Sequence, residues 1–91
     1  MQLVDYDPQW VSDGGREGMG VRFRCPHCET SLVIWFSNPL DRGQPPDRIQ
    51  HRAPLWRRTG TTFETLSLIP SINAVGHWHG FVTEGALVAC S

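Results

Sequence analysis

The sequence contains no lysine, and all of its eight basic residues are arginines. With a formal net charge of −1, it lacks the strongly basic balance of a domain that binds nucleic acid over its whole surface. No apolar run approaches the length of about 20 residues that a membrane-spanning helix needs. The first ten residues, MQLVDYDPQW, carry acids where a secretory signal has basic and apolar residues. These absences predict a cytoplasmic protein with no membrane partner.

Cysteine is scarce, and its count is odd. Three cysteines cannot all pair within one chain, so metal binding or free thiols are favoured over a disulfide framework. The composition, 40% hydrophobic and 19% charged, is that of a globular protein. A length of 91 residues predicts one domain over residues 1–91, with a small core that gains from a cross-link or a bound metal.

No segment shows a sustained helical period of apolar residues, so we expect little or no helix. Alternating or continuous apolar stretches predict strands instead, over residues 21–24, 32–36, 61–68, 77–82 and 86–90. Pro70 limits strand pairing and predicts an edge or a bend nearby. The predicted fold class is mainly β: a small antiparallel β domain with a zinc knuckle, in which residues 37–54 form a long loop containing proline and arginine.

Two pairs of potential metal ligands stand about fifty residues apart. Cys25 and Cys28 form a C-x-x-C pair, a spacing that lets two thiolates converge on one ion. His77 and His79 occupy alternate positions of a predicted strand, so both imidazoles leave the same face and Trp78 points the other way. Together the four residues predict a tetrahedral Zn²⁺ site.

The sequence leaves open which residues complete the zinc site. His27 lies inside the knuckle, and a tight turn at Glu84-Gly85 would bring Cys90 opposite His79, so either residue is a possible alternative metal ligand. Four protein ligands make a closed structural site, whereas three ligands and a water, with Glu84 or Glu29 as base, would make a zinc-dependent hydrolase. The structural interpretation is favoured.

Signals of catalysis are weak. No G-x-S-x-G motif occurs, and Ser67, Ser71 and His79 form no recognisable nucleophile elbow. No glycine-rich phosphate-binding motif occurs either. We therefore expect a non-enzymatic, zinc-stabilised binding module without catalytic residues.

Five of the eight arginines lie between residues 42 and 58. This stretch predicts a surface for a protein partner, with nucleic acid as the alternative; a solvated loop whose arginines pair with the acidic N-terminus is the competing interpretation. The candidate partner-binding residues are Trp56, Arg48, Arg52, Arg57 and Arg58.

Three segments carry a resemblance to a known family: F-R-C-P-x-C at residues 23–28, W-x-R-T-G-x-T-F-E-T-L-S-L-x-P-S-I at 56–72, and H-W-H-G-F-V-T-E-G at 77–85. The chain resembles a family of small tailed-phage and prophage proteins of unknown function, some of which are labelled "ammonia monooxygenase". Relatives often have a cysteine where this chain has Gly76-His77, which implies a metal ligand near that point without fixing its identity. The resemblance implies a phage accessory protein that acts on a host or phage protein in the bacterial cytoplasm.

Overall fold

The computed structural model describes residues 1–28, 30–41, 43–50 and 54–89. Seven strands dominate it, so the prediction of a small, mainly β domain is confirmed. The strands are β1 (Gln9–Asp13), β2 (Arg16–Arg24), β3 (Ser31–Phe36), β4 (Leu55–Thr59), β5 (Ser67–Ala74), β6 (Trp78–Thr83) and β7 (Ala86–Ala89). Helix is limited, in the described ranges, to a 3-10 turn η1 (Leu3–Tyr6) and one turn α1 (Asp47–Gln50) inside the predicted long loop.

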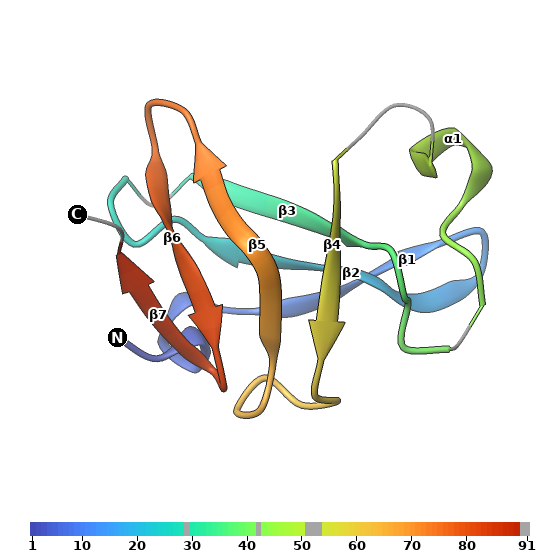
Figure 1. Cartoon of the computed structure of the whole chain (residues 1–91), viewed down its shortest axis with the longest axis horizontal. Coiled ribbons are helices and arrows are strands. Elements are labelled where there is room, and N and C mark those ends of the chain that lie inside the picture. Colours follow the sequence, from blue (N-terminus) through green and yellow to red (C-terminus); the bar gives the residue numbers. More distant parts are fainter. Residues whose placement is uncertain (29, 42, 51–53, 90–91) are drawn as a thin grey trace.

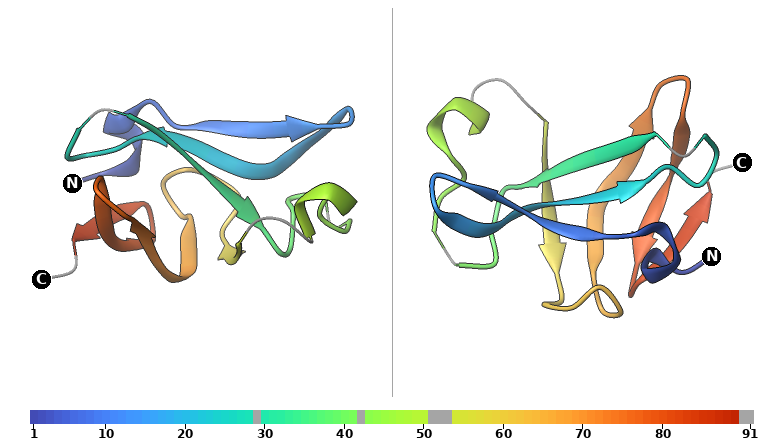
Figure 2. Two further views of the ribbon diagram at one scale, coloured as in Figure 1. Left: turned by 90° about the horizontal axis from the view of Figure 1, so that it is seen from above. Right: turned by 180° about the vertical axis from the view of Figure 1, so that it is seen from behind.

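The strands follow one another in the sheet in the order of the sequence, and all neighbours are antiparallel except β3 and β4. That parallel pairing is short, joining Trp35 with Leu55 and Phe36 with Trp56. The sheet folds over at this junction, so that β1–β3 form one layer and β4–β7 a second layer across it (Figures 1 and 2).

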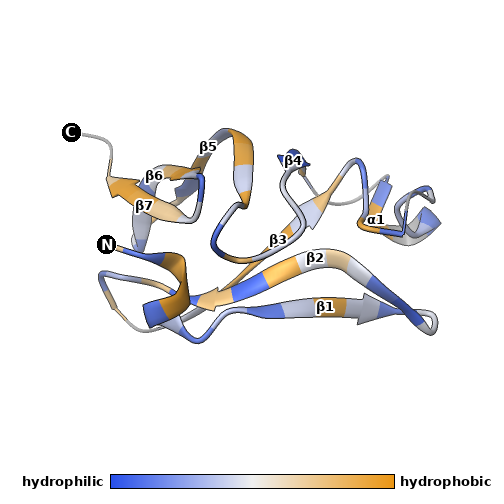
Figure 3. Ribbon diagram, turned by 90° about the horizontal axis from the view of Figure 1, so that it is seen from below, coloured by the Kyte–Doolittle hydropathy of each residue, from blue (hydrophilic) through white to orange (hydrophobic). Residues whose placement is uncertain are grey.

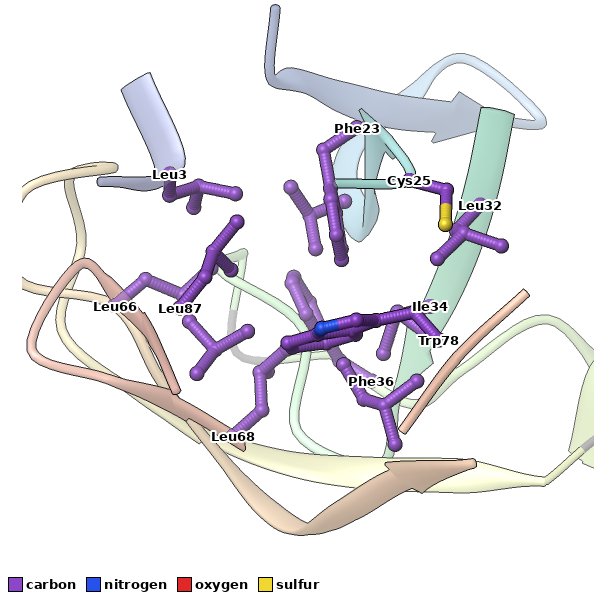
Figure 4. Packing of buried hydrophobic residues seen from close by; sticks show 13 residues of the cluster. Leu3, Phe23, Cys25, Leu32, Ile34, Phe36, Leu66, Leu68, Trp78 and Leu87 are labelled. Atoms are coloured by element: carbon purple, nitrogen blue, oxygen red, sulfur yellow. The ribbon is translucent and has the colours of Figure 1, made fainter. Parts of the chain in front are cut away.

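The core fills the space between the two layers. Hydrophobic and hydrophilic residues alternate along the end of β2, as Figure 3 shows, and the apolar ones face inward. Trp78 of β6 is 8% exposed and lies across the centre, where Phe23 meets it edge-on at a ring-centroid distance of 6.4 Å (Figure 4). A side chain at Gly80 would collide with the Trp78 ring, which explains the glycine in the sequence H-W-H-G.

No helix in the part of the chain that the structure describes is long and apolar enough to cross a membrane. The cytoplasmic location stays a prediction.

The strand predicted over residues 61–68 is wrong in its first part. Thr62 and Thr65 instead form a turn, in which the Thr65 amide donates to the Thr62 carbonyl at 3.2 Å and the two hydroxyls lie 2.8 Å apart. Threonine hydroxyls compete in this way with strand hydrogen bonds. The strand β5 begins only at Ser67.

Pro70 lies inside β5, which pairs with β4 on one side and β6 on the other, so the predicted edge position is wrong. The predicted bend is confirmed, because the register of β5 against β6 shifts between Leu68 and Ile72. Leu68 faces Val82 and Ile72 faces Gly80, so that three residues of β5 oppose a single residue of β6. This bulge accommodates a residue that has no amide hydrogen to donate.

Candidate functional site

The C-x-x-C segment forms the loop between β2 and β3. Cys25 is fully buried, and its amide donates to the Thr30 carbonyl at 2.7 Å. The amide of His27 donates to the Cys25 sulfur at 3.4 Å. The loop therefore turns its backbone toward the first thiol.

The second thiol contacts the turn between β5 and β6. Cys28 Sγ lies 3.0 Å from Nδ1 of His77, a residue 49 positions later in the chain. Hydrogen bonds from Thr30, together with the contacts to His77 and Cys25, lower the pKa of the Cys28 thiol to about 6. The sequence thus brings Cys25, Cys28 and His77 to one end of the molecule, where the β2–β3 loop meets the β5–β6 turn (Figure 1).

The two predicted strand histidines differ in their surroundings. His77 lies in the turn, where its amide donates to the Ala74 carbonyl at 2.8 Å, whereas His79 lies on the exposed face of β6. Trp78 between them points into the core, as predicted. A surface hollow is lined by His77 and His79 together with His27 and Asn73.

The four predicted zinc ligands are not assembled as a set. Within the described ranges, no three side chains of His, Cys, Asp or Glu are arranged to hold a metal ion. Cys90, which was predicted to lie opposite His79, and Glu29 fall outside the described residues. The pairing of β6 with β7 on which the Cys90 prediction rests is present, because Thr83 faces Ala86 and Gly80 faces Ala89.

A serine and a histidine share the exposed face of the β5–β6 pair. Asn73 of β5 stands directly opposite His79 of β6, and Ser71 is two residues before Asn73 on the same strand. Alternate residues of a strand leave the same face, so Ser71 is the diagonal neighbour of His79. Ser71 also closes the bulge, and its carbonyl accepts a hydrogen bond from Nε1 of Trp56 at 3.4 Å.

A second serine on the same strand is engaged structurally. The Ser67 hydroxyl accepts a hydrogen bond from the Glu84 amide at 2.8 Å. Among the described residues, no hydrogen bond engages the hydroxyl of Ser71. Ser71 is therefore the serine of β5 whose hydroxyl is available for chemistry.

The predicted partner-binding residues do not form one exposed patch among the described residues. Arg57 is exposed on β4, but Arg58 donates to the carbonyls of Gly60 at 2.9 Å and Pro39 at 3.1 Å, and burial lowers its pKa. Trp56 packs partly buried against the core. Arg42 and Arg52 lie outside the described residues, as does the side chain of Arg48.

Comparison with known proteins gives one family. A model described as bacterial ubiquitination-like system serine protease (BubE) matches residues 3–90. No curated protein and no solved structure matches the chain. The resemblance to phage proteins is not tested by these findings and stays a prediction.

The family match corrects the functional predictions. A family named for a serine protease points to an enzyme, so the expectations of a non-enzymatic binding module, of a nucleic-acid module and of a zinc hydrolase are wrong. Ser71 and His79, which form no recognisable motif in the sequence, are eight positions apart and are brought near each other by the register of β5 and β6. Because the match covers nearly the whole chain, the protein belongs to the BubE family of bacterial ubiquitination-like system serine proteases.

Proposed function

We propose that this chain hydrolyses peptide bonds with Ser71 as nucleophile and His79 as general base. A serine hydroxyl is a weak nucleophile until an adjacent base accepts its proton. The family named for a serine protease calls for such a pair, and the observation that carries the assignment is the diagonal placement of Ser71 and His79 on one exposed face. Diagonal neighbours have Cα atoms about 7–8 Å apart, within reach of an imidazole and a hydroxyl that turn toward each other.

The bulge supports the choice of Ser71. Bulges are frequent beside active sites, where they change the direction of a side chain. Here Ile69, Pro70 and Ser71 oppose only Phe81, so Ser71 belongs to a stretch that is released from the regular pairing of β5 with β6. Ser67, four residues earlier, is held by the Glu84 amide and lacks this freedom.

Asn73 lies where a residue that orients the His79 imidazole would be expected. It stands directly across from His79, and cross-strand partners have Cβ atoms about 4.5–5.5 Å apart. In serine and cysteine proteases a third residue holds the imidazole in the orientation and tautomer that the reaction needs, and an asparagine serves in some of them. Asn73 is thus a positioning residue that acts through His79.

The same face offers an apolar surface for a polypeptide. Ile69, Phe81 and Val88 are exposed by 64%, 43% and 49%, and the last two are paired across β6 and β7. Phe81 follows His79 by two positions, so its ring leaves the face that carries the proposed base. A protein substrate with apolar side chains near the scissile bond fits this surface; the predicted protein partner would then be a substrate.

The reaction follows from these roles. Ser71 Oγ attacks the carbonyl carbon of the scissile peptide bond while His79 accepts the hydroxyl proton. His79 then gives this proton to the departing amine, which leaves an ester between Ser71 and the acyl part of the substrate. A water molecule, deprotonated by His79, attacks the ester and releases the carboxylic acid and the free Ser71.

Substitution of the two serines of β5 tests the proposal. A proteome-derived peptide library is incubated with the wild-type chain, Ser71→Ala and Ser67→Ala, and the cleaved bonds are identified by mass spectrometry. Ser71→Ala is expected to lose at least about 10³-fold in rate, since a triad without its nucleophile retains little activity. Ser67→Ala is expected to cleave the same bonds and to lose about 1 kcal/mol of stability with its hydrogen bond.

Two results would contradict the proposal. The first is a wild-type chain that cleaves no bond in the library. The second is a folded Ser71→Ala variant that cleaves as fast as the wild type.

A further inference from the structure

Cys28 Sγ lies 3.0 Å from His77 Nδ1 where the β2–β3 loop contacts the β5–β6 turn, and Cys25 begins the same loop, its sulfur accepting from the His27 amide at 3.4 Å. Among the described residues these side chains do not form a complete ligand set, so a metal ion would have to draw them together. We propose that Cys25, Cys28 and His77 bind one zinc ion, with His27 as the fourth ligand. The ion would join two segments about fifty residues apart and is distinct from the proposed catalytic pair of Ser71 and His79.

The donor chemistry fits zinc. Two thiolates and two imidazoles form one of the common tetrahedral zinc sites. With Zn–S bonds of about 2.3 Å and Zn–N bonds of about 2.0–2.1 Å, a sulfur and a nitrogen on one tetrahedral ion lie about 3.6 Å apart. Cys28 and His77 need to separate only slightly to reach this spacing, and His77 lies in a turn that exposes it to solvent.

The backbone around the first thiol is also that of a metal-binding loop. The His27 amide donates to the Cys25 sulfur, and the chain reverses between the Cys25 amide and the Thr30 carbonyl. Hydrogen bonds to ligating sulfurs orient the ligands and stabilise their charged form. His27 lines the hollow that His77 also lines, so it lies near one of the proposed ligands.

The same contacts indicate that His79 is not a ligand of the proposed zinc ion. It lies on the strand face opposite Asn73, whereas His77 belongs to the turn that reaches Cys28. The sequence alone treats the two histidines as equivalent, and the structure separates them. The zinc site would therefore fix the turn from which β6, with His79 as its second residue, begins.

Metal analysis of single variants tests this assignment. The full chain is produced in zinc-supplemented cells, purified without chelators under reducing conditions, and its zinc content is measured by plasma mass spectrometry. The wild type is expected to carry about one zinc per chain, and Cys28→Ser and His77→Ala to lose it. His79→Ala is the matched control, expected to keep the zinc, and His27→Ala is expected to bind it more weakly.

Cobalt gives a second readout that does not depend on activity. Co²⁺ added to the zinc-free wild type is expected to produce the intense absorption of cobalt bound to thiolates in tetrahedral geometry, and Cys28→Ser to reduce it. Cys28 is exposed, so its substitution keeps the test valid even if the buried Cys25 cannot be replaced without unfolding.

Three outcomes would overturn the proposal. These are a folded wild type with neither zinc nor the cobalt spectrum, a His77→Ala variant that retains full zinc content, and loss of zinc in His79→Ala but not in His77→Ala. If Cys25 and Cys28 of the purified wild type form a disulfide under reducing conditions and no zinc is bound, this result would also overturn the proposal. Because the readouts are metal content and absorption, failure here leaves the proposed role of Ser71 unaffected.

Discussion

The two turns that bracket β6 are built by different means. At the Glu84-Gly85 end, backbone groups join three segments: the Gly85 amide donates to the Leu66 carbonyl at 2.8 Å, and the Leu3 amide donates to the Gly85 carbonyl at 2.8 Å. The Ser67 hydroxyl adds a third bond by accepting from Glu84. This end is fixed mainly by backbone groups, which do not change when side chains are exchanged.

The turn over residues 75–77 is held to the rest of the molecule by side chains. Its backbone bond, from the His77 amide to the Ala74 carbonyl, stays within the turn, and Val75 is 84% exposed. The contact with the β2–β3 loop is that of His77 with Cys28. The difference indicates that one end of β6 is specialised for holding the fold and the other for chemistry, since the proposed metal ligand and the proposed base lie at the second end.

The two turn glycines should respond differently to the same substitution. Gly85 and Gly76 have positive φ angles of 77° and 81°, but a Cβ on Gly85 would lie 2.5 Å from the Glu64 carbonyl oxygen, whereas one on Gly76 meets nothing within 4 Å. Gly76→Ala is expected to cost about 1–2 kcal/mol for the left-handed backbone. Gly85→Ala is expected to cost about 1–3 kcal/mol more for the collision with backbone. Urea denaturation measures both, and equal losses would show that the two ends do not differ.

Removal of the proposed zinc ion should destabilise only the end of β6 at the turn over residues 75–77. After chelation, amide hydrogen exchange at His77 is expected to accelerate, because the proposed zinc holds its turn, while exchange at Gly85 stays the same. Hydrogen exchange followed by nuclear magnetic resonance, with and without zinc, measures the two amides in one sample. Equal acceleration at both amides would mean that the metal stabilises the fold as a whole and not this turn.

Asn73 should affect activity without affecting the fold. Asn73→Ala is expected to lower kcat by up to about 10⁴-fold, the loss that follows when the residue that orients the imidazole of a catalytic triad is changed. Asn73→Asp, which can also accept a hydrogen bond from His79, is expected to restore most of the rate. Peptide hydrolysis and thermal melting are compared for both variants, and a rate that falls equally in both would exclude the orienting role.

The ion pair far from both turns should matter least. Arg16 donates to both oxygens of Asp41 at 2.7 and 2.9 Å, and this pairing lowers the pKa of Asp41 from 3.8 to about 2. A lowered carboxyl pKa stabilises the folded state fully above pH 3.8, and the effect is lost as the pH falls through 2. Asp41→Asn is expected to lower the melting temperature slightly at neutral pH, less near pH 2 and not at all well below pH 2, where the carboxyl is protonated in both states. A difference that persists well below pH 2 would show that another interaction of Asp41 is responsible.

Prediction from sequence succeeded where a pattern is local. The alternation around Phe23 and the apolar run at residues 32–36 each identify a strand, and the direction of Trp78 follows from its position between two polar neighbours. The first strand, β1, was not predicted, because residues 9–13 (QWVSD) show no alternation of apolar and polar residues and their partners lie on β2. Local apolar periodicity cannot identify a strand that forms because it pairs with a neighbouring strand.

The candidate site was harder to predict, because it depends on register. Ser71 and His79 become neighbours only after a bulge shifts β5 against β6, and the sequence around Pro70 indicates a bend without its size. The separation of His77 from His79 depends on the residue at which β6 begins, which is Trp78. The H-x-H pattern predicts two equivalent histidines on one strand. In the structure His77 lies in the turn, and only His79 lies in β6.

Covalent labelling tests the proposed role of Ser71 most directly. The intact wild-type protein is treated with a fluorophosphonate, which reacts with activated serines, and the modified residue is located by peptide mass spectrometry. One adduct per chain is expected on Ser71, lost in His79→Ala and retained in Ser67→Ala. An adduct on another serine of the catalytically active protein would contradict it.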